Sequence, residues 1–176
     1  QGDWSSDVCS SDLHSPDPNL VAAVLAEFDP DIVALQEVRR RQARRISRQL
    51  QMNVTWAFKH NGYTFLLPRR AEGHAIISPH RLSDIGHVRV SDPVPRRSFR
   101  RRIAQWASVS IDGRLVRVVN THLAAHELVD DRITQAGRVR TVVDGGDPQL
   151  TLVTGDFNDH REPEVVVVLA ATTHVD

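Results

Sequence analysis

The sequence predicts a single domain of the mixed α/β class. Three observations predict it. Segments with helical spacing of apolar residues alternate with short apolar runs, Gly-containing dipeptides mark strand hairpins, and 176 residues suffice for one hydrophobic core. Basic and acidic residues both number 22, so no overall field attracts nucleic acid or an anionic membrane. A single cysteine, Cys9, excludes an internal disulfide, and no apolar run approaches membrane-spanning length.

Residues 1–13 differ from the rest of the chain. They are rich in serine and aspartate, contain the only cysteine and show no periodicity. A disordered terminus would have this composition, but we interpret the string as a translated sequencing-adapter read. The domain is therefore expected to comprise residues 14–176.

The first predicted elements are a helix over residues 17–28 and a strand over residues 31–37. Asp17 is a typical N-cap, and Pro18 suits the first helical position, where its missing N–H costs nothing. Apolar residues then recur at helical spacing and form one predicted face: Leu20, Val21, Val24, Leu25 and Phe28. The continuous apolar run that follows predicts a strand buried on both faces, with Glu37 at its far end.

Residues 38–50 carry six arginines beside a thin apolar stripe, which predicts a surface helix. Phosphate binding is one function of such a run, but a solvated face is the commoner one, and we prefer it. Strand-like segments follow, the first two joined by a hairpin signal at Asn61-Gly62: residues 54–58, 63–67, 73–78 and 87–90.

The second half of the chain begins with the clearest hairpin, residues 102–111 and 114–121 around Asp112-Gly113. A helix is predicted over residues 128–144, followed by a buried strand that Gly155 ends. Residues 164–171 include four consecutive valines and fit either a helix or a strand.

Three predicted strands end in side chains that could take part in catalysis or bind a metal: Glu37, His122, and the pair Asp156 and Asn158. Taken singly, each has a plainer interpretation as a solvated strand end, a structural histidine or a turn. If residues 156–158 are extended, the carboxylate and the carboxamide point to the same side. Together the residue types fit phosphoester hydrolysis. Glu37 would bind Mg²⁺, Asp156 would activate water, and His122 and Asn158 would stabilise phosphoryl oxygens.

Four segments resemble, in order and spacing, the motifs of the endonuclease/exonuclease/phosphatase superfamily: residues 31–38, 73–78, 120–123 and 155–158. The resemblance implies a four-layer α/β/β/α sandwich of two mixed sheets flanked by helices. It also implies dependence on Mg²⁺ or Mn²⁺, with Glu37 as the metal ligand and the residues His122, Asp156 and Asn158 as catalytic groups. Asn120 and Arg102 match positions that approach the substrate in the family.

Two family features have no counterpart in this chain. The first strand of the family carries a metal-site asparagine, and residues 1–13 occupy its place. The family's terminal Ser-Asp-His motif is also missing, and His174 does not stand for it. The chain is therefore expected to be a fragment of the domain at both ends, and inactive as it stands.

The expected function is divalent-metal-dependent hydrolysis of phosphodiester or phosphomonoester bonds. The substrate would be a nucleic acid, a phospholipid or a sugar phosphate. One alternative is a lipid or inositol phosphate hydrolase, such as a sphingomyelinase-like enzyme, rather than a nuclease. Another is a non-catalytic protein on the same scaffold, which the joint presence of the four site residues disfavours. No stable protein partner and no transmembrane segment are implied, and either a cytoplasmic or a secreted location fits.

Overall fold

The computed structural model describes residues 17–61, 71–125, 127–147, 150–158, 165, 168 and 169. Its elements, in chain order, are α1 (Pro18–Glu27), β1 (Val33–Arg39), α2 (Arg40–Gln49), β2 (Asn53–His60), β3 (Glu72–Ser78), β4 (Leu82–Arg89), β5 (Ile103–Ile111), β6 (Arg114–His122), α3 (Val129–Asp144) and β7 (Thr151–Asp156). Residues 1–13 and the predicted strand over residues 63–67 lie outside the described part.

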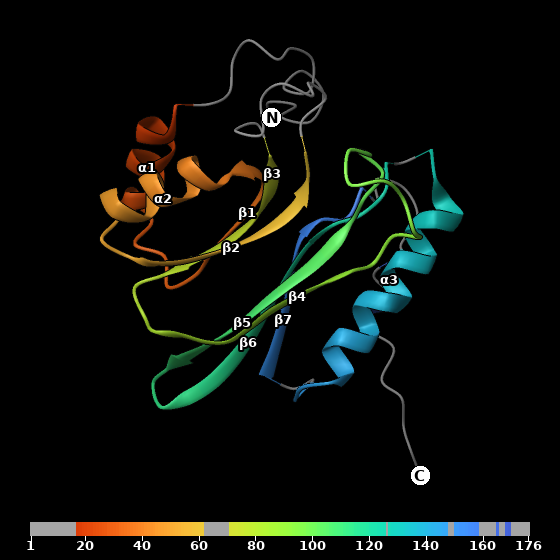
Figure 1. Ribbon diagram of the computed structural model, residues 1–176. Helices are drawn as coiled ribbons and strands as arrows, with labels where there is room; N and C mark the ends of the chain where they lie inside the picture. Colours follow the sequence, from red (N-terminus) through yellow and green to blue (C-terminus); the bar gives the residue numbers. More distant parts are fainter. Residues whose placement is uncertain are drawn as a thin grey trace, which may run out of the picture.

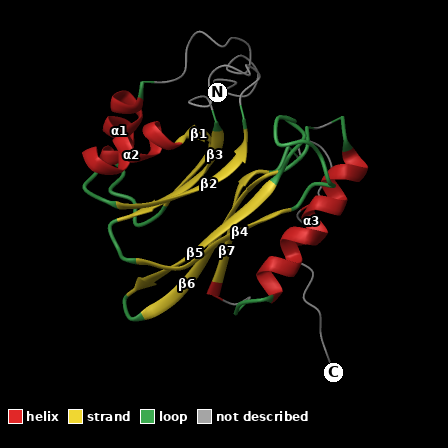
Figure 2. Cartoon of the chain, viewed as in Figure 1, coloured by secondary structure: helices red, strands yellow, loops and turns green. Residues whose placement is uncertain are grey.

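The strands form two sheets that pack face to face. One has the strand order β1-β3-β2 and the other β4-β5-β6-β7. Helices α1 and α2 cover the outer face of the first sheet, and α3 covers the outer face of the second (Figures 1 and 2). The predicted four-layer sandwich is thus confirmed. Among the described strands, the first sheet is wholly antiparallel, whereas the parallel β6–β7 pair makes the second sheet mixed.

Strand alternation distributes the core over three layers. One layer lies between the two sheets and includes Ile76, Ala107, Val109 and Val118. Outer layers lie beneath the helices: Ala22, Val33, Ile46 and Ile77 under α1 and α2, and Ala104, Val119, Leu123, Ala136 and Val139 under α3. Within the described part of the chain, no helix is long and apolar enough to cross a membrane.

Helix α1 begins as predicted, because the Asp17 carboxylate accepts a hydrogen bond of 2.9 Å from the Asn19 amide. The predicted apolar face is wrong in part, since only Val21 and Leu25 pack with Ala22 against the sheet. The remaining three residues are exposed: Leu20, Val24 and Phe28. They are spaced four apart and form a separate stripe, which the shallow contact of a ten-residue helix with the sheet leaves uncovered.

The boundaries of other elements differ from prediction where tertiary pairing extends them. Strand β1 continues to Arg39, so α2 starts at Arg40, and β4 starts at Leu82 instead of residue 87. The hairpin of β5 and β6 is confirmed, with positive φ at Asp112 and Gly113 as a type I′ turn requires. Three residues of the ambiguous apolar segment are described, and all three are helical: Val165, Val168 and Leu169.

Candidate active site

Glu37 lies on a β-bulge and not at the end of its strand, which corrects the prediction. The pairing of β1 with β3 shifts register between Leu35 and Val38, and Glu37 has a φ of 53°. A positive φ at glutamate is strained and persists only where neighbours fix the backbone. Two contacts do so: Gln36 Nε2 donates to Asn120 Oδ1 at 2.7 Å, and Trp56 Nε1 donates to the Val38 carbonyl at 2.9 Å. The bulge leaves the Glu37 side chain 54% exposed at the rim of the sandwich.

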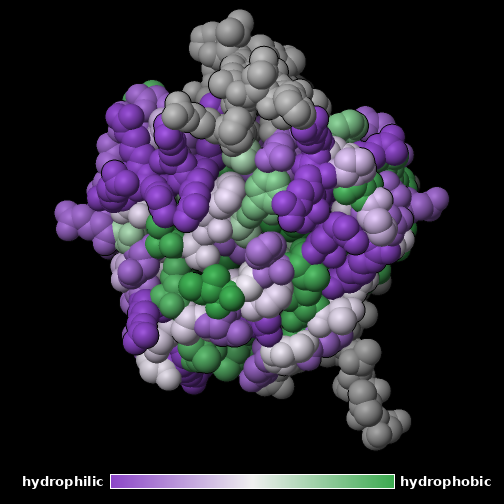
Figure 3. Space-filling model, viewed as in Figure 1, coloured by the Kyte–Doolittle hydropathy of each residue, from purple (hydrophilic) through white to green (hydrophobic). Residues whose placement is uncertain are grey.

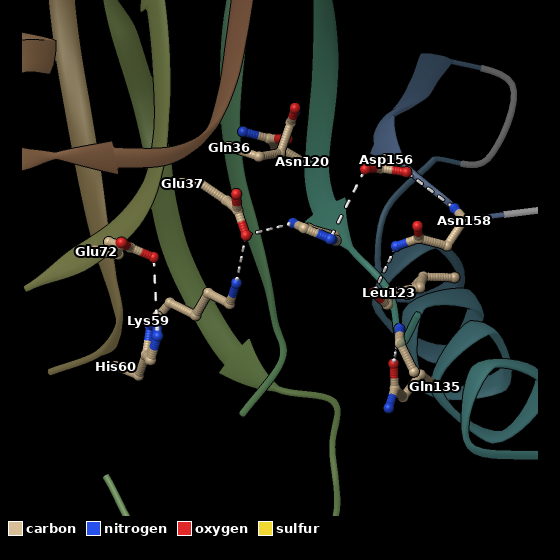
Figure 4. Close-up of polar contacts among 12 residues, drawn as sticks. Gln36, Glu37, Lys59, His60, Glu72, Asn120, Leu123, Gln135, Asp156 and Asn158 are labelled. Atoms are coloured by element: carbon tan, nitrogen blue, oxygen red, sulfur yellow. Dashed lines mark hydrogen bonds and ion pairs between the residues drawn. The ribbon is translucent and has the colours of Figure 1, made fainter. Parts of the chain in front are cut away.

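The Glu37 carboxylate has a cation beside it. Lys59 Nζ lies 3.4 Å from Glu37 Oε1, although Lys59 itself is only 1% exposed (Figure 4). Burial and, less strongly, the charge of Arg102 lower the pKa of Lys59, and the Glu37 carboxylate acts against them. Lys59 was not predicted as a site residue. The available signal was a lone lysine directly after a predicted strand in an otherwise arginine-rich chain.

His122 stands between Glu37 and Asp156. Its Nδ1 lies 3.5 Å from Glu37 Oε1, and its Nε2 lies 3.8 Å from Asp156 Oδ2. The position of His122 follows from the sheet topology, because His122 ends β6 and pairs in parallel register with Asp156, the last residue of β7. Burial, with the charges of Arg102 and Lys59, lowers the pKa of His122 to about 2. The flanking carboxylates favour the charged ring, but both are about half exposed and screened by solvent. The ring is therefore neutral at pH 7.

Asp156 and Asn158 are joined by a turn. The Asn158 amide donates to Asp156 Oδ1 at 3.0 Å, and Asn158 has a φ of 52° (Figure 4). The backbone is thus not extended beyond Asp156, so strand alternation does not determine where the two side chains point. The turn nevertheless brings the two side chains together. Asn158 Nδ2 donates to the Leu123 carbonyl at 3.2 Å, and Asp156 Oδ2 remains on the side of His122.

Asn120 is fully buried and cross-links the two sheets. Its Nδ2 donates to the carbonyls of Leu35 and Ala75 at 3.0 and 3.1 Å, and its Oδ1 accepts from Gln36. This carboxamide therefore fixes β6 against the bulge that carries Glu37, and its contact with a substrate stays a prediction. Arg102 precedes β5 and is also buried, close enough for its charge to lower the pKa of His122.

A layer of buried polar side chains lies behind the rim. Burial is the main cause that lowers the pKa of His60 to about 4 and that of His74 to about 3, so both rings are neutral at pH 7. His60 faces Glu72 at 3.8 Å (Figure 4). His74 Nδ1 contacts the Asn120 carbonyl oxygen at 3.3 Å. The space between the sheets is thus polar near the candidate site and apolar farther from it.

The oxygen donors at the rim suit a hard divalent cation. Among the described residues, no group of three or more histidine, cysteine, aspartate and glutamate side chains is arranged to hold a metal. Mg²⁺, however, commonly binds through one or two carboxylates and retains several waters. Glu37 offers a half-exposed carboxylate that already attracts the Lys59 ammonium, and Asp156 offers a second one beyond His122. The residues present therefore fit such an ion.

The fold and the rim define a class, the α/β/β/α sandwiches whose members are phosphoester hydrolases. The sequence profile described as "Endonuclease/Exonuclease/phosphatase family" matches residues 8–174, so the chain belongs to this family. Its members generally use divalent metals. A search of curated proteins gives no match.

Solved structures show the same fold at low sequence identity. A functionally unknown conserved protein from Enterococcus faecalis V583 aligns with a TM-score of 0.68 and 21% identity over 86% of this chain and 62% of its own. The mannosyl-6-phosphatase Bt3783 of Bacteroides thetaiotaomicron VPI-5482 aligns with a TM-score of 0.68 and 17% identity, over 88% of this chain and 61% of its own. Truncated Caenorhabditis elegans TDP2 aligns with a TM-score of 0.61 and 24% identity, over 84% of this chain and 57% of its own. The chain thus spans less than two thirds of the length of these structures.

Proposed function

We propose that the protein is a divalent-metal-dependent hydrolase of phosphoester bonds, with Glu37, His122, Asp156 and Asn158 at its active site. One observation carries the proposal. Residues from β1, β6 and β7 meet at one rim, where His122 lies 3.5 Å from Glu37 and 3.8 Å from Asp156. Phosphoryl transfer to water needs one carboxylate to bind a cation and another to activate water. It also needs neutral hydrogen-bond donors beside them.

Each side chain has a distinct part in this proposal. Glu37 would hold the metal, which when bound supplies positive charge to the phosphoryl oxygens. Asp156 takes a proton from the attacking water through its Oδ2, while the Asn158 amide fixes its Oδ1. The water oxygen then forms a bond to phosphorus as the bond to the leaving oxygen breaks, and the leaving oxygen keeps the bonding electron pair and takes a proton from solvent. His122, kept neutral by burial, and the second N–H of the Asn158 carboxamide donate to the phosphoryl oxygens.

A phosphomonoester is a second candidate substrate class beside a phosphodiester. The name of the mannosyl-6-phosphatase, an enzyme of the same fold, is the observation that favours it. The carboxylates of Glu37 and Asp156, which are both open to solvent, do not by themselves distinguish the two substrate classes.

Chelation tests the metal dependence. In a version of the protein that carries every motif of the family, we expect Mg²⁺ or Mn²⁺ to restore hydrolysis of p-nitrophenyl phosphate or bis-p-nitrophenyl phosphate after treatment with EDTA. Zn²⁺ should restore little, because the donors are carboxylate oxygen atoms and the described residues of the rim include no thiolate. The control is Glu37→Gln, in which added Mg²⁺ should restore little or nothing. Full activity in excess chelator would refute the proposal.

A further inference from the structure

A pocket of about 470 Å³ lies on the outer side of β2, beside the start of α2. Its lining comprises Arg40, Arg41, Arg44, Trp56, Phe58, Asn61 and Ala71. The three arginines come from the first turns of α2, and the two aromatic rings lie two residues apart on β2 and so project to the same face. Figure 3 shows hydrophilic residues gathered over α1 and α2. The pocket is distinct from the inter-sheet rim but shares the junction of β1 and α2 with it.

The arginines of the pocket are exposed and have no side-chain partner within the described part of the chain. On the same helix, Arg45 is occupied, because its Nε donates to Asn19 Oδ1 at 2.9 Å. Among the described residues, those that line the pocket include no aspartate or glutamate. Positive charge is therefore concentrated here although the whole chain has no net charge.

The aromatic residues form a rigid platform. Trp56 and Phe58 meet edge to face, with centroids 6.4 Å apart and an interplanar angle of 62°. Trp56 lies directly over Gly73, where an added Cβ would come within 2.7 Å of the ring. The guanidinium of Arg101 lies 5.9 Å from the Phe58 centroid and adds another cation. Rigid rings between unpaired guanidinium groups are how proteins stack single-stranded bases and neutralise the flanking phosphates.

We propose that this pocket binds single-stranded nucleic acid, with a base stacked on the Trp56–Phe58 platform and the adjacent phosphates paired with Arg40, Arg41 and Arg44. This inference rests on the proposed function and assigns its substrate class. The volume of the pocket suits a nucleotide-sized ligand. Glu37 lies three residues before Arg40, and Trp56 donates to the carbonyl of Val38. A nucleic-acid strand bound in the pocket would thus exit the pocket close to the hydrolytic rim.

Fluorescence anisotropy with a fluorescein-labelled 12-nucleotide oligothymidylate tests the charge contacts. The 176-residue chain is measured in EDTA, so binding is read without hydrolysis. Arg41→Ala with Arg44→Ala should weaken binding at least tenfold and reduce the slope of log affinity against log salt by about 1.4. Arg48→Ala with Arg81→Ala removes equal charge from exposed positions outside the pocket and should change affinity less than twofold. Equal weakening by the two double variants would overturn the proposal.

An abasic oligonucleotide of equal length tests the stacking. It keeps the phosphates and loses the bases, so the wild-type protein should bind it at least fivefold more weakly, and Phe58→Leu should narrow that difference. Equal affinity for both oligonucleotides would contradict base recognition. Binding to vesicles that contain phosphoinositides, without binding to the oligonucleotide, would instead identify a lipid surface and overturn the inference.

The two proposals fail separately. If the pocket binds the oligonucleotide but Mg²⁺ produces no cleavage of any phosphoester by a version of the protein that carries every motif of the family, the hydrolytic function is refuted and the nucleic-acid site stands. If hydrolysis occurs while the arginine variants bind nucleic acid like the wild type, only the pocket assignment is refuted.

Discussion

In a version of the protein that carries every motif of the family, replacing Asp156 with asparagine is expected to lower kcat by about 10² to 10⁴-fold and to leave KM nearly unchanged. Asparagine keeps the Oδ1 atom that accepts the Asn158 amide, so the turn survives. It loses the negative oxygen that lies 3.8 Å from His122 Nε2 and takes the proton of the attacking water. Since that transfer occurs in the transition state, the loss falls on turnover. Steady-state kinetics on a chromogenic phosphoester, with thermal unfolding to confirm the fold, measures it.

A matched control for this change is Asp130→Asn, which removes the same charge from the exposed first turn of α3. It should leave both kinetic constants within about twofold of the wild type, as is usual for such a surface position. If Asp156→Asn instead raised KM at constant kcat, Asp156 would be only a turn residue, and the proposed hydrolytic role would fail.

Gly155→Ala is expected to destabilise the protein by about 3 kcal/mol or more and to abolish activity. Gly155 has a φ of 138°, a region that side chains rarely adopt, and an added Cβ would lie 1.8 Å from the Thr121 carbonyl oxygen. Relief requires β7 to move away from β6. That movement would separate Asp156 from His122, which depend on this pairing for their contact. Urea denaturation and the same kinetic assay measure both effects.

Gly137→Ala provides the comparison for Gly155. Gly137 lies in α3, and an added Cβ there meets nothing within 4 Å. Because alanine favours helix, this change should raise the free energy of unfolding by about 0.5–1 kcal/mol. A Gly155→Ala protein with wild-type stability and turnover would show that the β6–β7 contact does not position the site.

The parts of the fold that local chemistry determines could be predicted from the sequence. Asp17 caps α1 through its own neighbour, and Asp112-Gly113 turns a hairpin between adjacent strands. The placement of Glu37 could not be predicted in this way, because its bulge arises from pairing with β3, a strand more than 30 residues away. Its position at the rim therefore depends on contacts that no local pattern encodes.

The candidate site was predictable in its residue types but not in its supports. His122 and Asp156 end strands, as expected, and parallel pairing places them side by side. Gln36 and Lys59 were not predicted, since the roles of both come from partners in other strands. The arginine run was expected to be a solvated face. All of its members except the half-buried Arg39 are exposed, but only the fold reveals that rings from β2 complete a pocket beside them.

The most direct test of the central claim is a crystal structure of the protein soaked with Mn²⁺ and phosphate, with anomalous scattering used to locate the metal. We expect Mn²⁺ bound by the Glu37 carboxylate, and a phosphate that contacts Mn²⁺, His122 and Asn158. Mn²⁺ bound elsewhere, with the Glu37 carboxylate still occupied by Lys59 and no phosphate beside His122, would contradict a phosphoester hydrolase site at this rim.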